Sequence, residues 1–338
     1  MPTNHQTFAQ PPSARQRVLD QIFGVLTRAA AWIAGLLVAV IVLQIAWKAV
    51  PAVREHGLSF LTGTTWDPKQ QQFGILPQIW GTLYSSLLAI VIGGVLGLCI
   101  AIFLSEGFLG SFAFRVLSLF GAQHRRWALR IPDRADLLLR NLVELLAAIP
   151  SVVYGLWGIF VVIPLIRPWA DWLHARFGWT ALFSEPLQGP GLLPAVIVLT
   201  VMILPTVTAL SRDALASVPP KLRIAAYGIG ATRWETMLAV LLPAAKRGIF
   251  GAIVIAFGRA LGETMALAML IGNANKISLS ILSPANTLAA LLANSFPEAG
   301  PKEVPVLMFA ALTLLLITLV VNVFGALIMS RAGVEKKA

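Results

Sequence analysis

The chain has 338 residues, of which 57% are hydrophobic and only 12% charged, with a mean hydropathy of +0.80 and a formal charge of +11. Soluble domains carry about 25% charged residues, so this composition excludes an ordinary soluble domain and predicts one all-α, polytopic membrane protein. The positive charge does not indicate nucleic-acid binding, because the basic residues lie between apolar spans rather than on a common face. With a single cysteine, Cys99, the chain has no intrachain disulfide.

Six apolar stretches are long enough to form transmembrane helices, since a helix needs about 20 residues to cross a bilayer. The predicted spans are 29–50, 78–104, 141–166, 191–210, 248–272 and 304–329. The remaining parts of the predicted organisation are an N-terminal tail at 1–28, an outer loop at 51–77, a core of five spans within 78–329 and a C-terminal tail at 330–338.

The distribution of lysine and arginine predicts which loops face the cytoplasm. If the N-terminus is inside, the inner segments hold 18 of the 26 lysines and arginines and the outer segments hold 7. This asymmetry predicts that both termini are cytoplasmic. It also makes the long, basic segment 105–140 an inner loop.

The inner segment 211–247 has the pattern of a docking element between two spans. Pro219 and Pro220 end one helix and set the entry angle of the next. A short helical stretch follows, and Gly230 frees the backbone to turn sharply after it. We expect a second helix to return toward the membrane and to break at Pro243.

Arg259 and Glu263 interrupt the fifth predicted span, in the stretch FGRALGETMAL. Arg259 is expected near the bilayer midplane, where a charge costs at least about 2.5–3.5 kcal/mol. The i,i+4 spacing would place the two side chains on one helical face, where they can pair, and Gly258 and Gly262 would let another helix approach closely. The pair is a candidate waypoint for an anion, and the alternative is an ion pair that only fixes helix packing.

Two further polar residues are candidates for lining a path through the membrane. Ser151 and Tyr154 lie in the stretch IPSVVYG, where Pro150 and Gly155 open the local helix. The alternative is that both side chains serve helix packing.

The chain is not expected to hydrolyse ATP or to bind zinc. No lysine is preceded by glycine, so the phosphate-binding GxxxxGK[ST] loop is absent. The four histidines fall in the N-terminal tail or in loops, without an HExxH motif or a cysteine partner.

The segment 211–247 resembles the EAA loop of ABC importer permeases. The pattern Ala-Ala-x3-Gly-x11-Leu-Pro is carried by Ala225, Ala226, Gly230, Leu242 and Pro243. The resemblance implies a short coupling helix that fits a cleft on a separate ATPase subunit. Because Ile224 stands where the motif usually has a glutamate, we expect Lys221 or Arg223 to supply the polar contact instead.

The wider resemblance is to the PstC-type permease of the phosphate-specific ABC importer. It rests on the stretches IPSVVYGLWG, FGRALGETMAL and IGNANKISLSILSPANTLAALLAN, and on the outer-loop pattern WDP…FGILPQIWGT. The resemblance implies a type I ABC importer permease fold in the bacterial plasma (inner) membrane. It also implies that Arg259 and Glu263 act in translocation.

The resemblance further implies a set of partners. They are a second permease subunit of the PstA type, a dimer of PstB-type ATPase subunits and an extracytoplasmic PstS-type phosphate-binding protein. ATP and Mg would be bound by the ATPase, and this chain would hold no cofactor.

Other interpretations stay open at this point. The chain resembles, less closely, the sister permease of the same importer or a sulfate-type ABC permease. A proton-coupled secondary anion carrier, in which Glu263 titrates, belongs to a different class. Such carriers need no EAA-like loop and often show inverted repeats and broken helices, neither of which is evident in the sequence.

Overall fold

The computed structural model describes residues 13–105 and 131–331, and nearly all of the elements in them are helical. The elements are α1 (Ala14–His56), α2 (Ser59–Thr62), β1 (Trp66–Asp67), β2 (Gln72–Phe73), α3 (Leu76–Ser105), α5 (Ile131–Ala148), α6 (Ser151–Trp157), η3 (Gly158–Val162), α7 (Ile163–Phe177), α8 (Leu192–Ala216), α9 (Pro220–Gly228), α10 (Arg233–Glu235), η4 (Thr236–Leu241), α11 (Leu242–Leu261), α12 (Met265–Leu270), α13 (Leu288–Ser295), η5 (Phe296–Glu298) and α14 (Glu303–Arg331).

Six helical stretches of the described chain are long and apolar enough to cross a membrane. They are Ala14–His56, Leu76–Ser105, Ser151–Phe177, Leu192–Ala216, Arg233–Leu261 and Glu303–Ser330. The all-α class and the number of predicted spans are therefore confirmed. Of the predicted inner loop 105–140, residues 106–130 lie outside the described residues, and from Ile131 onward the chain is already helix α5 and not a loop.

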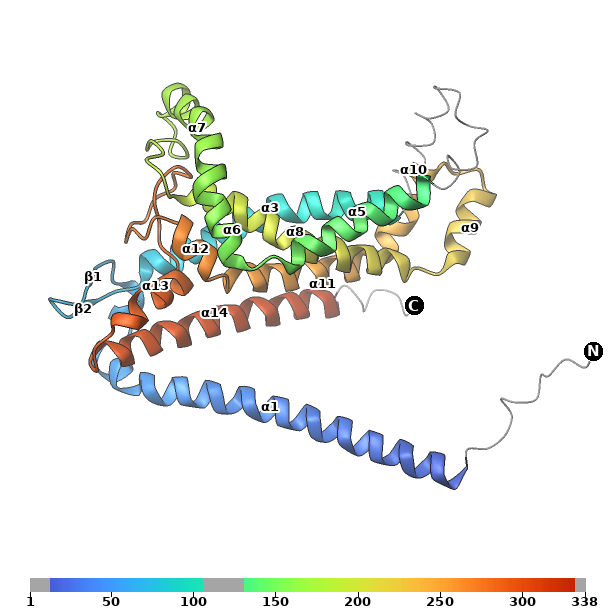
Figure 1. The fold of residues 1–338 in the computed structure, drawn as a ribbon, viewed down its shortest axis with the longest axis horizontal. Coiled ribbons are helices and arrows are strands. Elements are labelled where there is room, and N and C mark those ends of the chain that lie inside the picture. The colour runs from blue at the N-terminus through green and yellow to red at the C-terminus, as the bar shows by residue number, and fades with distance from the viewer. Residues whose placement is uncertain (1–12, 106–130, 332–338) are drawn as a thin grey trace, which may run out of the picture.

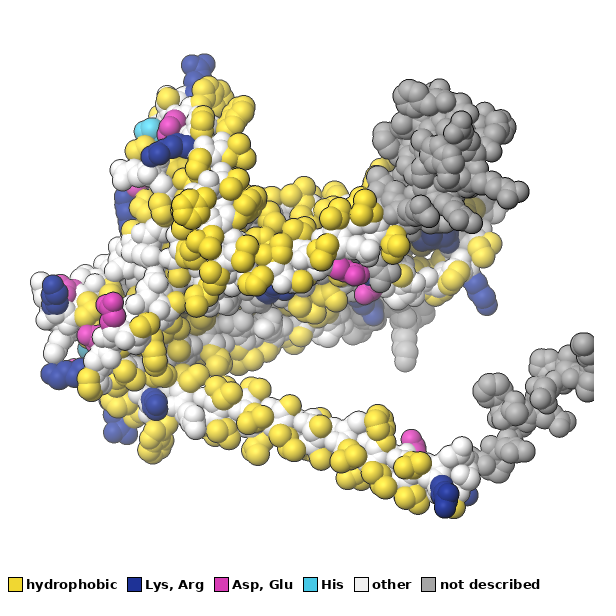
Figure 2. Space-filling view, viewed as in Figure 1, with side chains coloured by type: hydrophobic (Ala, Val, Ile, Leu, Met, Phe, Trp, Pro, Cys, Tyr) yellow, Lys and Arg dark blue, Asp and Glu magenta, His cyan; other side chains and the backbone are white. Residues whose placement is uncertain are grey.

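The long helices α3, α8, α11 and α14 lie side by side along one direction (Figure 1). The β1–β2 hairpin and α13 lie at one end of this bundle, which we call the hairpin end, and α9 and α10 lie at the opposite end, the α9 end. Hydrophobic side chains cover the flanks of the bundle, whereas many of the charged side chains gather toward its two ends (Figure 2). This distribution suits a bundle that crosses a bilayer along its long axis.

Helix α8 is the central element of the bundle, packed against α3 and α11. Of its most apolar window, 67% is buried inside the chain. Small residues let α3 approach it closely: a Cβ added at Gly93 would lie 2.9 Å from the Ile203 side chain, and one added at Gly97 would lie 2.8 Å from Val207. Close approach at small residues is the usual way in which helices pack inside a membrane.

Helix α1 is much longer than its predicted span 29–50. It begins at Ala14, inside the predicted tail, where Ser13 and Gln16 form a capping box. Its 43 residues correspond to about 64 Å of helix, roughly twice the thickness of a bilayer core. Only Ala49 and Ala52 are buried along it, because α1 meets α14 near the hairpin end and diverges from it toward the α9 end (Figure 1).

The predicted third span, 141–166, is not one continuous helix. Helix α5 ends at Ala148, and α6 starts at Ser151 with Pro150 as its N-cap. Proline has no N–H and disfavours a helical conformation in the residue before it, which explains the break. Beyond α6 and the π-turn η3, α7 runs across the direction of the bundle (Figure 1).

The predicted fifth span, 248–272, is displaced and interrupted. One helical stretch runs from Arg233 to Leu261, stops at Gly262, and resumes as the short helix α12. The predicted break at Pro243 is wrong, because this residue lies in the first turn of α11 directly after the π-turn η4. A π-turn widens the helix, which relieves the clash of the proline ring with the preceding turn.

The irregular segment 272–287, between α12 and α13, is held against the first turns of α3. The Trp80 indole Nε1 donates to the carbonyl oxygen of Ser278 at 3.0 Å, and the Tyr84 hydroxyl donates to that of Leu279 at 2.8 Å. A Cβ at Gly81 would clash with the carbonyl oxygen of Asn286. These contacts fix an extended, hydrogen-bonded segment beside the start of the second long helix.

Candidate functional site

The α9 end carries an exposed apolar surface on α9 and just after it, which we call the coupling surface. It consists of Leu222, Ile224, Tyr227 and Ile229. Ile224 is 68% exposed and Ile229 is 88% exposed, although large apolar side chains outside a membrane are usually covered. An apolar surface on a short helix between two spans is suited to docking against another protein.

The turn after α9 depends on Gly230, which has a φ of +89°. Its N–H donates to the carbonyl oxygen of Tyr227 at 3.0 Å, and a Cβ placed there would meet nothing within 4 Å. Gly230 is therefore required for its backbone conformation and not for close packing. Helix α10 then starts with Thr232 as its N-cap, whose side chain forms a capping box with Glu235.

The other predicted coupling residues lie on or near α9, with different exposure. Ala225 is exposed and Ala226 is buried. Lys221 is exposed, whereas Arg223 is half-buried and already has an interaction partner within the chain. Since Ile224 points outward in place of the glutamate of the motif, the surface is dominated by apolar side chains.

Arg259 lies in the last turn of α11 and not in the middle of a helix. The backbone of Gly262, at φ −92° and ψ 0°, ends the helix three residues later. Arg259 is exposed, and its guanidinium Nη1 lies 3.4 Å from the hydroxyl of Thr206 on α8. The structure therefore places this cation where α11 packs against α8.

The predicted ion pair between Arg259 and Glu263 is not formed. Among the described residues, these two side chains do not form an ion pair with each other. The reason is that i,i+4 pairing requires a continuous helix, whereas this helix ends between them. Glu263 is half-buried in the break, where its N–H donates to the carbonyl oxygen of Ala260 at 3.4 Å.

The two glycines beside these charges have different roles. A Cβ added at Gly258 would lie 3.1 Å from Oδ1 of Asn322 on α14, so a neighbouring helix does approach there as predicted. Gly262 would meet only the backbone of its own helix, and it serves as the C-cap of α11. Of the two glycines predicted to let a neighbouring helix approach, only Gly258 makes such a contact, whereas Gly262 ends the helix.

Tyr154 is buried, and its hydroxyl has a structural partner. It donates to the carbonyl oxygen of Leu146 at 2.7 Å. In a continuous helix, this carbonyl would accept from the N–H of residue 150, but Pro150 has none. The tyrosine therefore replaces the hydrogen bond that the break removes. Ser151 is half-buried at the start of α6.

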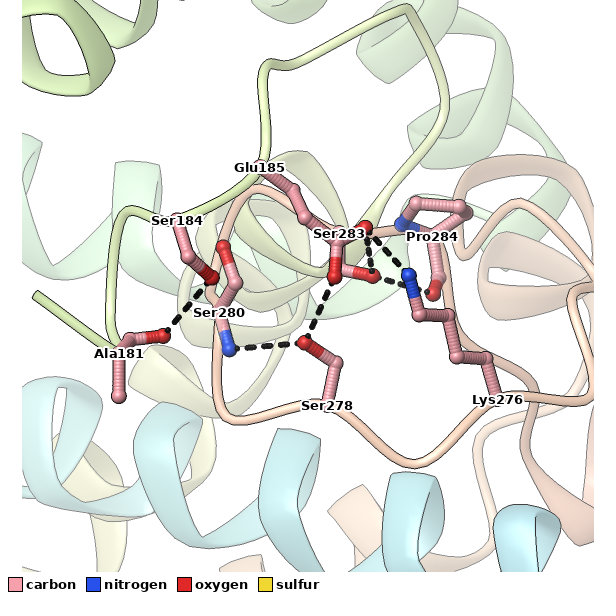
Figure 3. A network of polar contacts seen from close by, with 8 residues as sticks. All are labelled: Ala181, Ser184, Glu185, Lys276, Ser278, Ser280, Ser283 and Pro284. Atoms are coloured by element: carbon pink, nitrogen blue, oxygen red, sulfur yellow. Dashed lines mark hydrogen bonds and ion pairs between the residues drawn. The ribbon is translucent and has the colours of Figure 1, made fainter. Parts of the chain in front are cut away.

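A second polar cluster, absent from the predicted site, joins the loop after α7 to the 272–287 segment (Figure 3). Glu185 forms an ion pair with Lys276, with 2.8 Å between Oε2 and Nζ, and accepts hydrogen bonds from Ser278 and Ser283. The hydrogen bond from Lys276 is the main reason why the pKa of Glu185 lies below its ordinary value. The polar runs SPAN and NANK are the signal in the sequence that could have indicated this region, although we predicted no site there.

The 272–287 segment also holds an amide cluster with the start of α3. Gln78 is fully buried and donates from Nε2 to Oδ1 of Asn275 at 2.6 Å. Asn286 donates to the same oxygen at 3.4 Å. Thr82 accepts at Oγ1 from the N–H of Leu288 at 2.9 Å, which fixes the start of α13.

Comparison with known proteins decides the family. The model for binding-protein-dependent transport system inner membrane components matches residues 116–333. The chain belongs to this family. The permease is 38% identical to the phosphate transport system permease protein PstC of Mesorhizobium japonicum, over 84% of this chain and 82% of that protein. It is 36% identical to PstC of Pasteurella multocida, over 98% of both chains.

Solved structures show the same fold. A subunit of the MetNI methionine ABC transporter in an inward-facing conformation aligns with a TM-score of 0.52 at 18% identity, covering 79% of the permease and 99% of that chain. A chain of a bacterial ABC transporter that imports alginate aligns with a TM-score of 0.52 at 14% identity, covering 94% and 100%. The predicted ABC importer permease fold and a multi-pass location in the membrane are thereby confirmed.

Proposed function

We propose that the permease is the PstC-type subunit of an ATP-driven phosphate importer and forms half of its translocation path. The observation that carries the proposal is the match to a phosphate transport permease over 98% of the chain. The contact between the Arg259 guanidinium and the Thr206 hydroxyl supports it, because a guanidinium beside a hydroxyl is suited to an oxyanion. Glu263 lies in the same helix break. Its carboxylate would repel a bound anion and so limit how tightly Arg259 holds it.

Import of phosphate requires coupled energy. Moving a dianion into a cell at 100 mV, negative inside, costs about 4.6 kcal/mol, since each charge costs about 2.3 kcal/mol. The sequence holds no GxxxxGK[ST] loop, so this energy would be delivered by a separate ATPase. In this proposal, the coupling surface docks in a cleft of that ATPase, which binds ATP and Mg while this chain holds no cofactor.

The complete importer would contain three kinds of partner. A PstA-type permease would supply the other half of the path, a PstB-type ATPase dimer would engage the α9 end, and a PstS-type phosphate-binding protein would deliver the anion to the hairpin end. This arrangement requires the α9 end to face the cytoplasm, which the excess of lysine and arginine in the inner segments supports.

The proposal has two competitors with distinct signatures. A sulfate-type permease would show uptake of sulfate that phosphate does not inhibit. A proton-coupled carrier gains support from the helix break at Gly262, since such carriers often contain broken helices. It would import its anion after loss of ATP, and it would stop when the proton gradient is removed.

Gly230→Ala tests the coupling role, with Gly228→Ala as the matched control. Both glycines have open space around a new Cβ, but only Gly230 has a positive φ. Strain of this kind costs of order 1–3 kcal/mol, which corresponds to an association with the ATPase that is about 5- to 150-fold weaker. The measurements are phosphate uptake and the amount of ATPase subunit that copurifies with the permease.

We expect Gly230→Ala to reduce both quantities and Gly228→Ala to leave them near the wild-type values. If the ATPase copurifies equally well with both variants and uptake is unchanged, segment 211–247 is not the coupling element. If the wild-type complex imports no phosphate, the substrate assignment fails.

A further inference from the structure

Three hydrogen-bond donors converge on the Glu185 carboxylate (Figure 3). The Lys276 ammonium lies 2.8 Å from Oε2, the Ser278 hydroxyl donates to Oε1 at 3.1 Å and the Ser283 hydroxyl donates to Oε2 at 3.1 Å. The Ser283 hydroxyl also lies 3.1 Å from the carbonyl oxygen of Pro284, so its one hydrogen is shared. All three donors belong to the 272–287 segment, and the acceptor belongs to the loop after α7.

The donors are held in place independently of Glu185. The Ser278 hydroxyl accepts from the N–H of Ser280 at 3.1 Å, which leaves its own hydrogen free to point at the carboxylate. The carbonyl oxygens of Ser278 and Ser283 accept from Trp80 and from the N–H of Leu192, both at 3.0 Å. The segment that carries the donors is therefore attached to α3 and α8, two long helices of the bundle.

The loop that carries the acceptor is anchored on both sides of Glu185, by the contact of His174 with the Phe183 carbonyl oxygen and by the buried Leu187, but Glu185 itself is held only through its side chain. Within the described part of the chain, the backbone of Glu185 forms no hydrogen bond, and Pro186 follows it, which has no N–H to donate. The Leu182 carbonyl, which accepts from the N–H of Ile281 at 3.0 Å, is the nearby backbone contact between the two segments. The carboxylate can thus leave its donors without unfolding either segment.

An ammonium and two hydroxyls form a donor set that accepts an inorganic oxyanion as well as a carboxylate. We infer that Lys276, Ser278 and Ser283 form a binding site for an oxyanion at the hairpin end, and that the Glu185 carboxylate occupies it as an internal competitor. The inference rests on the proposed function when it names phosphate as the anion. Glu185 would then keep the site filled until a delivered anion displaces it.

The geometry favours a small ion over an acidic side chain of a docked protein. Of the three donors, Ser283 is only 1% exposed and Ser278 is half-buried, so the two hydroxyls are largely covered. The Lys276 side chain, at 51% exposure, leaves one open side through which a hydrated ion can enter. The lowered pKa of Glu185 means that its carboxylate is ionised at neutral pH. The carboxylate and a phosphate dianion therefore repel each other and cannot occupy the site together.

Equilibrium dialysis tests this inference on the assembled transporter without its binding protein and without nucleotide. Radiolabelled inorganic phosphate and sulfate are each titrated against the wild type, Glu185→Ala, Glu185→Gln and the double variant Glu185→Ala with Lys276→Gln. Glu298→Ala is the control, because Glu298 is an exposed carboxylate in η5. The thermal unfolding temperature of each complex shows whether it is folded.

We expect Glu185→Ala to bind phosphate at least about tenfold more tightly than the wild type, because the competing charge is gone. Adding Lys276→Gln to Glu185→Ala should cancel this gain in phosphate affinity. Glu185→Gln should show part of the gain, and Glu298→Ala should bind phosphate as the wild type does. Unchanged or weaker phosphate binding in folded Glu185→Ala and Glu185→Gln overturns the inference. The inference is also overturned if Glu185→Ala binds the phosphate-binding protein more tightly but not phosphate. The donor set would then accept an acidic side chain of that protein.

Uptake assays on the wild-type complex, read together with the dialysis, separate this inference from the proposed function. A wild-type complex that imports sulfate and not phosphate would refute the phosphate assignment. The oxyanion site would still stand if Glu185→Ala tightened sulfate binding, and it would fall if neither anion bound more tightly.

Discussion

Arg259 has a different setting from the one its spacing suggests. In a continuous helix, its charge would be balanced by Glu263 one turn away, but the helix ends at Gly262 and the two side chains do not pair. The Thr206 hydroxyl lies 3.4 Å from the guanidinium instead. An exposed cation beside a neutral hydroxyl is better placed to meet an anion than one already neutralised by a carboxylate.

The first prediction concerns this cation. Arg259→Gln should lower phosphate uptake about tenfold or more, because a hydrogen bond to a charged group contributes about 1.5–3 kcal/mol. Arg259→Lys should retain part of the activity, since it keeps the charge and loses the planar guanidinium fork. Uptake of labelled phosphate at micromolar supply is the measurement.

Lys246→Gln is the matched control for Arg259, because Lys246 is an exposed cation on the same helix α11. It should import phosphate at nearly the wild-type rate. Normal import by Arg259→Gln, with a normal amount of folded protein, would mean that Arg259 is only structural.

At the scale of single elements, helix α3 shows how a glycine sets the position of a functional segment. Gly81 lies directly against the carbonyl oxygen of Asn286, which precedes the N-cap Thr287 of α13. The neighbouring residues Trp80 and Tyr84 hold the same segment by hydrogen bonds. The first turns of α3 therefore position the Lys276 donor set.

Gly81→Ala should destabilise this contact, because the new methyl group has no space without a backbone shift. Overpacking of this kind typically costs about 1–3 kcal/mol. Gly94→Ala on the same helix is the control, since a Cβ there meets nothing within 4 Å. The thermal unfolding temperature of the purified complex should fall for Gly81→Ala and stay near the wild-type value for Gly94→Ala; equal values would refute the close contact.

The coupling surface shows how the side chains of one helix, α9, decide the kind of contact that it can make. Ile224 replaces the glutamate of the EAA pattern and is largely exposed, together with Leu222, Tyr227 and Ile229. Burial of apolar surface is insensitive to salt, unlike an exposed ion pair. The docking of α9 is therefore expected to rely on shape and apolar contact more than on charge.

At the scale of the whole molecule, the two ends of the bundle differ in charge and in structure. The α9 end carries the coupling surface and the hairpin end carries the polar 272–287 segment (Figure 1). The lysine and arginine count predicts that the α9 end is cytoplasmic. An orientation of this kind is tested directly by labelling.

Single cysteines at the two ends test the orientation in a Cys99→Ala background. Gly300→Cys at the hairpin end and Gly228→Cys at the α9 end each have open space for a side chain. A membrane-impermeant thiol reagent applied to intact spheroplasts should label Gly300→Cys, and it should label Gly228→Cys only after lysis. The reverse pattern would invert the predicted topology.

The small part of helix α1 that is buried within the chain also concerns the molecule as a whole. Apart from Ala49 and Ala52, its side chains are not buried within the chain, and its apolar flank faces outward along most of its length (Figure 2). In a bilayer, lipid or another membrane subunit covers this flank, so its apolar side chains are not exposed to water. The chain by itself does not need α1 to bury its core around α8.

The sequence by itself determined the class of protein and the number of spans, and it indicated the short helix in 211–247 that we propose as the coupling element. These follow from local chemistry: about 20 apolar residues span a bilayer, prolines and Gly230 delimit α9, and the family's pattern in 211–247 is contiguous. The tertiary structure decided where Arg259 lies, which partner Tyr154 has and how Glu185 meets Lys276. Hydropathy averages over a window and does not register a helix break at one glycine or one proline. The Glu185 cluster joins residues more than 90 positions apart, and only the packing of the 272–287 segment on α3 and α8 brings them together.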